Sequence, residues 1–285
     1  MRYVIVAESG SDIPPELADK YGIYIVPMHV SFDTETKDDG SFPADEIFSY
    51  YEETKKLPVT SGCVPEDFRA VFDEIHDRYP GRHILHLAYS AVTTCSFQSA
   101  LIAGEGRDYV TSVDTRSVTI GQGMIVLAVA EYLREKPDCP LEEVLHVVDK
   151  YCRMCRLCFF PGDLVYLKAG GRVSNAAYLG AKLLSINPLI ELREGKLVAT
   201  RKYRGNIGKS AVKLLKDFVE ERQLKKQMIA FGFSPGLHEK IRKEITEQAR
   251  NMGFAQICWF CTGCVISAHG GPGGFGICGF FNERE

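Results

Sequence analysis

Short apolar runs alternate with amphipathic segments along the first half of the sequence, and this alternation restricts the fold more than any other feature. The runs typical of strands cover residues 2–7, 23–31, 84–89 and 108–113. The segments with apolar residues at helical spacing cover 14–21, 43–55, 65–75, 94–104 and 118–134. Because strands and helices alternate, the first half is predicted to form a mainly parallel sheet covered by helices, which is an α/β fold.

The second half has a different pattern after the linker-like segment Lys136–Pro140 and the helix that follows it. Helices are predicted near 163–168 and at 175–184, 207–222 and 236–251. Strands are predicted in a hairpin at 189–192 and 197–200, and at 227–233, 255–261 and 275–281. This mixture predicts an α+β domain with mixed or antiparallel pairing. The length of 285 residues suits two domains, which we expect to cover 1–158 and 159–285.

The charge of the chain gives no reason to expect a nucleic-acid partner. Lys and Arg number 34 against 37 Asp and Glu, so the net charge is −3 at pH 7. The apolar run at 3–7 is too short for a signal peptide, and no segment reaches the roughly 18 apolar residues of a membrane span. We therefore expect a cytoplasmic protein without a transmembrane segment, whose ten cysteines are free thiols.

Six of the cysteines form two clusters with a spacing of three residues, which leaves a metal or iron–sulfur site open as an alternative. The clusters are Cys152, Cys155 and Cys158, and Cys258, Cys261 and Cys264. If 255–261 is a strand, Cys258 and Cys261 point to opposite faces and cannot share a metal ion. Core or half-buried thiols are therefore the prediction, and no metal is expected.

A single histidine, His269, is followed by a glycine-rich turn, Gly270–Gly276. Glycine allows the backbone to approach another surface or a ligand closely, and Pro272 stiffens the turn. The turn is therefore predicted to hold His269 at a site. The glycines also fit a dinucleotide-binding fingerprint, but the apolar run at 275–281 predicts a strand where the fingerprint requires a helix.

Two loops rich in hydroxyl groups lie immediately before predicted helices. They are Thr60-Ser61-Gly62, before the helix at Pro65, and Ser90–Ser96, after the strand that ends at Tyr89. Ligands of open α/β sheets bind near the carboxyl ends of strands, and the free N–H groups of a helix N-terminus together with hydroxyls suit an anion. Simple N-capping by Ser and Thr is the alternative.

Six segments, in order along the chain, resemble motifs of one known family. They are Glu8–Pro14, Thr60–Phe68, Ser90–Ala100, Asp163–Ser174, Asn187–Arg204 and His269–Gly273. The first is similar to Asp-Ser-x-x-Asp-Leu/Ile-Pro, and the last is close to His-Thr-Gly-Pro-Gly. These are motifs of the DegV family, also called fatty-acid-binding or fatty acid kinase B proteins, and the resemblance runs the whole length of the chain.

The resemblance implies a DegV-like fold of two domains that hold a long-chain fatty acid in a cleft between them. The acyl chain would lie in an apolar tunnel and the carboxylate at the interdomain cleft, where Thr60 would donate its hydroxyl. The residues implied to surround the ligand are Thr60, Ser61, Ser90, Thr94, Cys95 and His269. The fatty acid is the implied ligand, and no other cofactor is expected.

The implied partner is an ATP-dependent fatty acid kinase subunit, which would convert the presented acid into an acyl phosphate for phospholipid synthesis. Arg172 and Arg204 correspond to exposed basic positions that dock this kinase or steady phosphate. The protein would then be a carrier and not an enzyme, with transient membrane contact possible. The chain departs from the family pattern in the two loops, where Gly62-Cys63 replaces Gln-Pro, Ala91 replaces Ser, and Thr94-Cys95 replaces Ser-Gly.

The alternative from another class is a hydrolase that acts on a small ester or lipid. It would use Ser90 or Thr94 as the nucleophile, with His269 as the base and an acid such as Asp114. An acid placed to orient His269 cannot be identified from the sequence. The fatty-acid carrier is therefore the preferred prediction.

Overall fold

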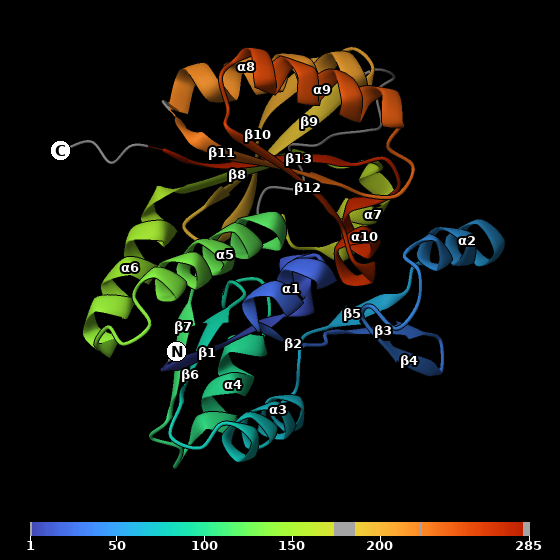
Figure 1. Cartoon of the computed structure of the whole chain (residues 1–285). Helices are drawn as coiled ribbons and strands as arrows, with labels where there is room; N and C mark the ends of the chain where they lie inside the picture. The colour runs from blue at the N-terminus through green and yellow to red at the C-terminus, as the bar shows by residue number, and fades with distance from the viewer. Residues whose placement is uncertain (1, 174–185, 223, 282–285) are drawn as a thin grey trace.

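The computed structural model of the chain describes residues 2–173, 186–222 and 224–281. Two large sheets lie one above the other, and helix α5 (Thr119–Glu135) lies between them (Figure 1). The helix predicted at 175–184 is outside the described residues. Within the described residues, no helix is both long and apolar enough to cross a membrane.

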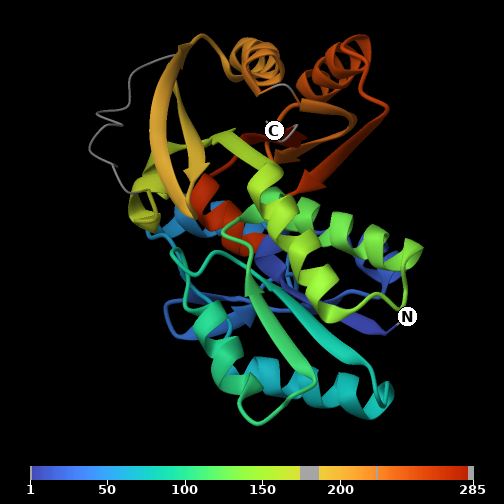
Figure 2. The ribbon, with the colours of Figure 1, turned by 90° about the vertical axis from the view of Figure 1, so that its left-hand side faces the viewer.

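The first sheet has four parallel strands in the order β2-β1-β6-β7. They are β1 (Tyr3–Glu8), β2 (Tyr24–Val26), β6 (His83–Ala88) and β7 (Val110–Asp114). The predicted parallel sheet is therefore confirmed. Four helices flank it, α1 (Pro15–Tyr21) and α5 on one side and α3 (Pro65–Arg78) and α4 (Ser96–Gly104) on the other (Figure 2). Strands covered on both faces need apolar side chains on both, which explains why β1 and β6 are continuous apolar runs.

A small antiparallel sheet extends to one side of the first sheet, in the order β4-β3-β5. Its strands are β3 (His29–Phe32), β4 (Glu35–Asp38) and β5 (Val59–Ser61), and α2 (Asp45–Thr54) connects the last two. The prediction of one strand over 23–31 is wrong, because the chain is broken at Pro27-Met28 into β2 and β3. Proline lacks the N–H that a continuous ladder requires.

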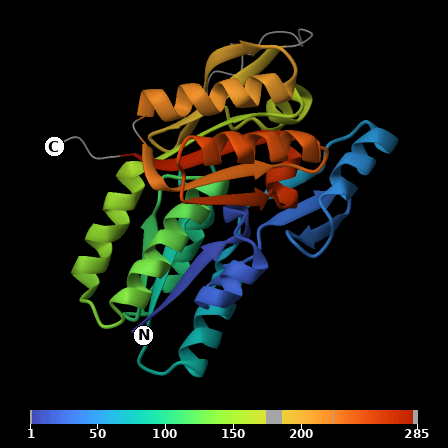
Figure 3. The ribbon, with the colours of Figure 1, turned by 45° about the horizontal axis from the view of Figure 1, so that its top comes forward.

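The second large sheet has six strands in the order β10-β9-β8-β13-β11-β12. They are β8 (Cys155–Phe160), β9 (Ile186–Arg193), β10 (Lys196–Arg204), β11 (Leu224–Phe233), β12 (Gln256–Cys261) and β13 (Phe275–Phe281). All neighbours are antiparallel except β11 and β12, which confirms the predicted mixed sheet. Helices α8 (Ile207–Arg222) and α9 (Glu239–Asn251) cover its outer face (Figure 3).

The helix predicted after Lys136–Pro140 is α6 (Leu141–Met154). Two elements of this half are absent from the sequence prediction, the strand β8, which follows α6 immediately, and the helix α10 (Cys264–Gly270), which precedes the glycine-rich turn. The helix predicted near 163–168 is α7 (Leu164–Gly170), which packs against α10. The predicted domain boundary after residue 158 falls inside β8 and remains a prediction.

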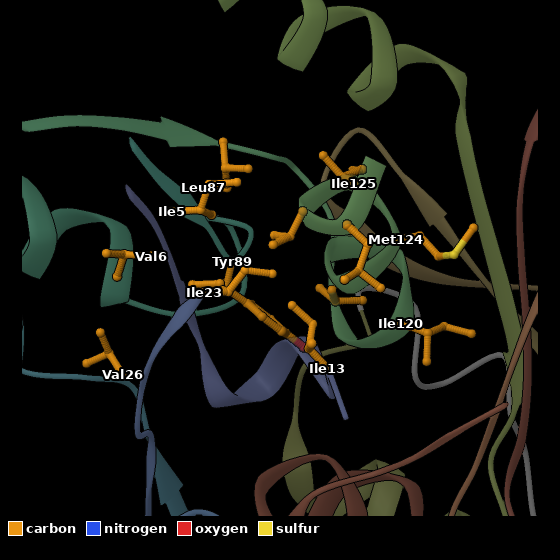
Figure 4. Packing of buried hydrophobic residues seen from close by; sticks show 14 of the residues in the cluster. Ile5, Val6, Ile13, Ile23, Val26, Leu87, Tyr89, Ile120, Met124 and Ile125 are labelled. Atoms are coloured by element: carbon orange, nitrogen blue, oxygen red, sulfur yellow. The ribbon is translucent and has the colours of Figure 1, made fainter. Parts of the chain in front are cut away.

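The helix α5 is apolar on nearly all sides because it contacts strands of both sheets. Figure 4 shows its Met124 and Ile125 in the same buried cluster as Ile5 and Leu87 of the first sheet. Its first turn, at Ile120, points the other way, since a Cβ placed at Gly232 of β11 would lie 3.1 Å from Ile120 Cγ2. The helix thus joins the two sheets into one packed body.

A buried polar cluster lies at the carboxyl end of β1. Glu8 and His86 are both completely buried, and His86 Nε2 lies 3.3 Å from Glu8 Oε1. The other carboxylate oxygen of Glu8 accepts hydrogen bonds from Tyr89 N (2.9 Å) and from Gln122 Nε2 of α5 (2.7 Å). Glu8 therefore connects β1, β6, α5 and the start of the loop that contains Ser90.

Candidate functional site

A mainly apolar pocket lies between the two large sheets. Its cavity volume is about 120 Å³, and it opens to solvent. Side chains from β8, α5, β11, α10 and β13 form its apolar walls, among them Leu157, Ile120, Phe233, Ile266 and Phe275.

The polar end of the pocket is formed by Thr60 of β5 and His269 of α10. Thr60 Oγ1 and His269 Nε2 lie 2.7 Å apart, although the residues are separated by 209 positions in the sequence. Ser61, Thr94 and Arg172 also line the pocket. The structure therefore brings these five predicted residues to one cavity, and their binding roles remain predictions.

The two hydroxyl-rich loops pack closely against each other at Gly62. A Cβ at this position would lie 2.2 Å from Thr94 Oγ1 and 2.5 Å from Ser96 Oγ. Ser96 Oγ also accepts a hydrogen bond from Cys63 N (3.1 Å). The N-cap residues of α3 and α4 are Val64 and Cys95, and neither uses a hydroxyl as the capping group. Thr94 Oγ1 accepts a long hydrogen bond from Ser96 N (3.4 Å) at the start of α4, so the N-capping alternative holds in part for the second loop and not for the first.

His269 is held in a neutral form. Burial lowers the pKa of its imidazole to about 4, and the charge of Arg172 acts in the same direction. Gly170 lies against the Nδ1 edge of the ring, since a Cβ there would be 2.1 Å from Nδ1. Among the described residues, Nδ1 has no hydrogen-bond partner. A neutral imidazole at this position can act as a hydrogen-bond donor or acceptor without bringing a buried charge.

The neutral state of His269 predicts a loss of stability in acid. Its folded-state pKa lies below the ordinary value, so the unfolded chain binds a proton more readily between about pH 6.5 and pH 4. The free energy of unfolding is expected to fall by about 2 to 3 kcal/mol from this group over that interval. Denaturant unfolding of wild type and His269→Gln should show a stability difference that shrinks as the pH falls. The exposed His146→Gln variant serves as the control, and a difference that stays constant with pH would refute the assignment.

Two carboxylates of the first half hold the N-terminus of α10. Asp39 Oδ1 accepts hydrogen bonds from Cys264 N (2.7 Å) and Val265 N (3.3 Å), and Asp12 Oδ1 accepts one from Gly263 N (2.7 Å). Burial raises the pKa of Asp12 to about 8. Asp39 could not be selected from the sequence, because no helix is predicted at 264–270 and an acidic turn residue has no distinguishing pattern.

The remaining predicted residues lie elsewhere. Ser90 Oγ donates a hydrogen bond to Gly195 O (2.8 Å) in the turn between β9 and β10, and among the described residues Ser90 and Cys95 are not part of the pocket lining. Cys95 is exposed. Arg172 is exposed and Nη1 donates to Gly170 O (2.7 Å), whereas Arg204 is exposed at the end of β10. The ligand roles of Ser90 and Cys95 and the docking role of Arg204 remain predictions.

The hydrolase alternative has little geometric support. Asp114 Oδ1 accepts hydrogen bonds from Ala91 N and Arg116 N, which gives it a structural role in its own turn. The sequence contains one Gly-x-Ser-x-Gly pattern, at Gly232–Gly236, so the expectation that the chain has no such nucleophile elbow is wrong. Its Ser234 is buried, donates to Gly271 O (2.6 Å) and accepts from Gly274 N (2.7 Å), so this hydroxyl fixes the glycine-rich turn.

The cysteine clusters do not converge. Cys152 lies on α6, Cys155 and Cys158 lie on β8, and the residues of the second cluster are divided between β12 and α10. Within the described parts of the chain, no group of three or more His, Cys, Asp or Glu side chains has the arrangement of a metal site.

Comparison with known proteins places the chain in a family. Residues 2–282 match the family described as "Uncharacterised protein, DegV family". A DegV domain-containing protein of Streptococcus pyogenes serotype M1 is 30% identical over 288 residues, which cover 95% of this chain and 96% of that protein.

Solved structures share the fold over the whole length. A DegV family protein from Thermus thermophilus, described by its fatty acid binding, is 31% identical with a TM-score of 0.88, and the match covers 99% of this chain and 100% of that one. A stearic-acid-binding protein from Eubacterium ventriosum is 22% identical with a TM-score of 0.83, and the match covers 98% of each chain. The family match, the sequence relatives and the shared fold agree with the six motifs, and the chain belongs to the DegV family.

Proposed function

We propose that this protein binds one long-chain fatty acid and presents its carboxylate to a separate, ATP-dependent fatty acid kinase. The observation that carries the proposal is the mainly apolar pocket with a single polar end at Thr60 and His269. A fatty acid has the same division into a long apolar part and one polar end. The description of the Thermus thermophilus relative by its fatty acid binding supports this choice of ligand.

The apolar walls supply the affinity in this proposal. Burial of a methylene group contributes about 0.8 kcal/mol, so a dozen methylenes contribute on the order of 10 kcal/mol before the cost of ordering the ligand is subtracted. Such a ligand remains bound through purification.

The polar end compensates for desolvation of the carboxylate, which costs several kcal/mol when the group has no partners. In the tautomer with its proton on Nε2, neutral His269 would donate to Thr60 Oγ1, and the Thr60 hydroxyl would then donate its own proton to the carboxylate. Ser61 and Thr94 offer further hydroxyls, and Arg172 contributes a positive charge at the pocket wall. In this proposal these groups bind the anion of the fatty acid.

The exposed face beside this polar end suits the transfer step. Arg172 is exposed and lines the pocket, so it can contact both the bound acid and a docked protein. The kinase would supply the nucleotide and the catalytic groups, and the carrier would act as a co-substrate in the cytoplasm for phospholipid synthesis. Arg204 is a second proposed docking residue, and transient contact with a membrane is compatible with loading of the acid.

Mass spectrometry of the purified protein tests the binding proposal first. Denaturing extraction is expected to release about one long-chain fatty acid per chain, and the released species identify the preferred chain length and saturation. Addition of the kinase and ATP to the loaded protein is then expected to convert the acid to an acyl phosphate. A protein that is empty as purified and takes up no long-chain acid would contradict the proposal.

Substitution of Thr60 by valine tests the role of the polar end. Valine keeps the branched shape that suits β5 but removes the hydroxyl, so fatty-acid affinity is expected to fall by about 10- to 100-fold, the range for a hydrogen bond to a charged group. Equilibrium binding of a fluorescent fatty acid measures the change. Thr36→Val, at an exposed position of β4, is the matched control. Equal affinities of the two variants would place the carboxylate elsewhere.

A further inference from the structure

His29 of β3 lies between two carboxylates. Its Nδ1 is 3.0 Å from Asp38 Oδ1 of β4, and its Nε2 is 2.9 Å from Asp67 Oδ2 of α3. The His29 side chain is 16% exposed, and that of Asp67 is 22% exposed. Both ring nitrogens therefore face an acceptor in a partly buried setting.

This geometry requires a doubly protonated ring. An ionised carboxylate only accepts hydrogen bonds, and a neutral imidazole can donate from one of its nitrogens only. A neutral His29 would leave a ring lone pair facing a carboxylate oxygen at about 3 Å. Burial alone lowers the pKa of His29, but its hydrogen bonds to Asp67 and Asp38 outweigh burial, so the pKa is raised above its ordinary value.

The hydrogen bond between His29 and Asp67 connects His29 to the loop after β5, the strand that carries Thr60. The same oxygen that faces His29 accepts a hydrogen bond from Val64 N (2.7 Å), where the loop after β5 enters α3. His29 also pairs with Ser61 across the β3–β5 ladder. His29 and Asp67 therefore fix both ends of the segment that runs from Ser61 to Val64.

The hydrogen bond between His29 and Asp38 connects His29, through the neighbouring Asp39, to the helix that carries His269. The next residue, Asp39, donates its N–H to Met28 O (2.7 Å) and accepts hydrogen bonds from Cys264 N and Val265 N at the start of α10. His269 is in the last turn of this seven-residue helix. A shift of Asp38 therefore acts on Asp39 and through it on the helix that carries His269.

We propose that protonated His29 is a positioning residue that holds the Thr60 loop and the His269 helix in register, so that fatty-acid affinity declines as His29 loses its proton. This inference rests on the proposed fatty-acid function for its ligand. On deprotonation one of the two hydrogen bonds is lost, and the segment attached to the released carboxylate is no longer fixed. The hydrogen bond expected to break is the one to Asp38, because the Asp38 side chain is 60% exposed.

Few other ionisable groups lie close enough to His29 to affect its titration. The charged groups that face His29 among the described residues are Asp38 on β4 and Asp67 on α3, while its neighbour on β5 is the uncharged Ser61. Two other groups near the site titrate separately. His269 has a pKa of about 4 and Asp12 a pKa of about 8. A variant at residue 29 is therefore needed to isolate its contribution.

Nuclear magnetic resonance titration of the histidine rings is the direct test. Linkage requires that the ligand raise the pKa of His29 if protonation of His29 raises the affinity for the ligand. A rise of one unit corresponds to a tenfold change in affinity. We expect the His29 pKa in the ligand-free protein to lie above 6.5, to be lower in Asp38→Asn, and to rise by about half a unit to one unit on addition of oleate. An identical His29 pKa with and without bound oleate would overturn the proposal.

Binding measurements between about pH 6 and pH 9 provide the second test. Wild-type affinity for oleate is expected to fall about three- to tenfold as the pH rises through the His29 titration, and His29→Gln is expected to lose this component. His76→Gln, at an exposed position of α3, should keep the wild-type profile. The oleate affinity of Asp12→Asn should also fall as the pH rises through the His29 titration, but any change in affinity that Asp12 causes near pH 8 should be absent. A His29→Gln profile that matches wild type would contradict the inference.

The two proposals fail in different ways. If the protein binds no fatty acid at all, the proposed function fails, while the titration of ligand-free wild type and Asp38→Asn still shows whether His29 bridges the two carboxylates. If the protein binds oleate normally but with no contribution from His29 to the pH profile, only the positioning role fails.

Discussion

Replacement of Gly62 by valine is expected to weaken fatty-acid binding by about 100-fold or more. A Cβ at residue 62 would lie 2.2 Å from Thr94 Oγ1 and 2.5 Å from Ser96 Oγ, well inside van der Waals contact. Overpacking of this kind lowers the stability of the folded protein by about 1 to 3 kcal/mol. Separation of the two loops also moves the hydroxyls of Thr60 and Thr94 away from the proposed carboxylate position, and each lost hydrogen bond costs about 1.5 to 3 kcal/mol of binding free energy. Equilibrium binding of a fluorescent fatty acid, together with extraction of the purified variant, measures the loss.

Gly104→Val is the control for this experiment. Gly104 is in α4, and the nearest atom to a Cβ there is Val110 Cγ1 at 3.7 Å, an ordinary contact. This variant is expected to bind fatty acid like wild type. The circular dichroism spectrum and melting temperature of both variants show whether each protein is folded. A folded Gly62→Val protein with affinity within threefold of wild type would show that the close contact between the loops is not required for binding.

Replacement of Glu8 by alanine is expected to destabilise the protein by about 3 to 5 kcal/mol. The change leaves Tyr89 N and one N–H of Gln122 without their acceptor, and it removes the partner of His86 in a fully buried site. Loss of a partner for a buried polar group costs about 1 to 3 kcal/mol for each group, and broken buried pairs reach 3 to 5 kcal/mol. Urea denaturation measures the free energy of unfolding.

Two further variants show whether this effect belongs to the buried cluster. Glu8→Gln keeps one acceptor oxygen and is expected to lose less stability than Glu8→Ala. Glu74→Ala removes an exposed carboxylate whose ion pair with Arg78 is 3.9 Å long, and it is expected to change stability by less than about 1 kcal/mol. If Glu8→Ala were no more harmful than Glu74→Ala, the cluster would not be important for folding.

The parallel sheet could be predicted because its strands are covered on both sides. Strands β1 and β6 must be apolar on both faces, so they appear in the sequence as continuous apolar runs separated by helical patterns. In contrast, β4 consists of Glu-Thr-Lys-Asp on the protein surface. Its pairing with β3 comes from the backbone, and its side chains carry no strand pattern. The small sheet that positions Thr60 therefore was not predicted.

The strand β8 could not be predicted for a different reason. It follows α6 with no intervening turn residue, and the cysteines at three-residue spacing continue a helix-like pattern across the junction. The strand is fixed by its neighbours β9 and β13, which are distant in sequence. Tertiary pairing thus decides its conformation where local preference is ambiguous.

In the candidate site too, single residues could be selected from local sequence patterns, whereas contacts between distant residues could not. The hydroxyl loops could be selected because strand ends before helices are common ligand positions, and His269 because of the glycines that follow it. The contact between Thr60 and His269 depends on the packing of the small sheet against α10, which no local pattern reports. The bridging position of His29 was not predicted either, since its two carboxylate partners are nine and 38 residues away in the sequence.

The position of β13 between β8 and β11 sets the order in which the protein can mature during synthesis on the ribosome. Residues 275–281 complete a sheet whose other strands have all been made before them, and until they arrive β8 and β11 each present an unpaired edge. The turn that follows His269 is also made just before this strand. A nascent chain is therefore expected to be prone to aggregation and unable to take up its ligand until this last strand is inserted.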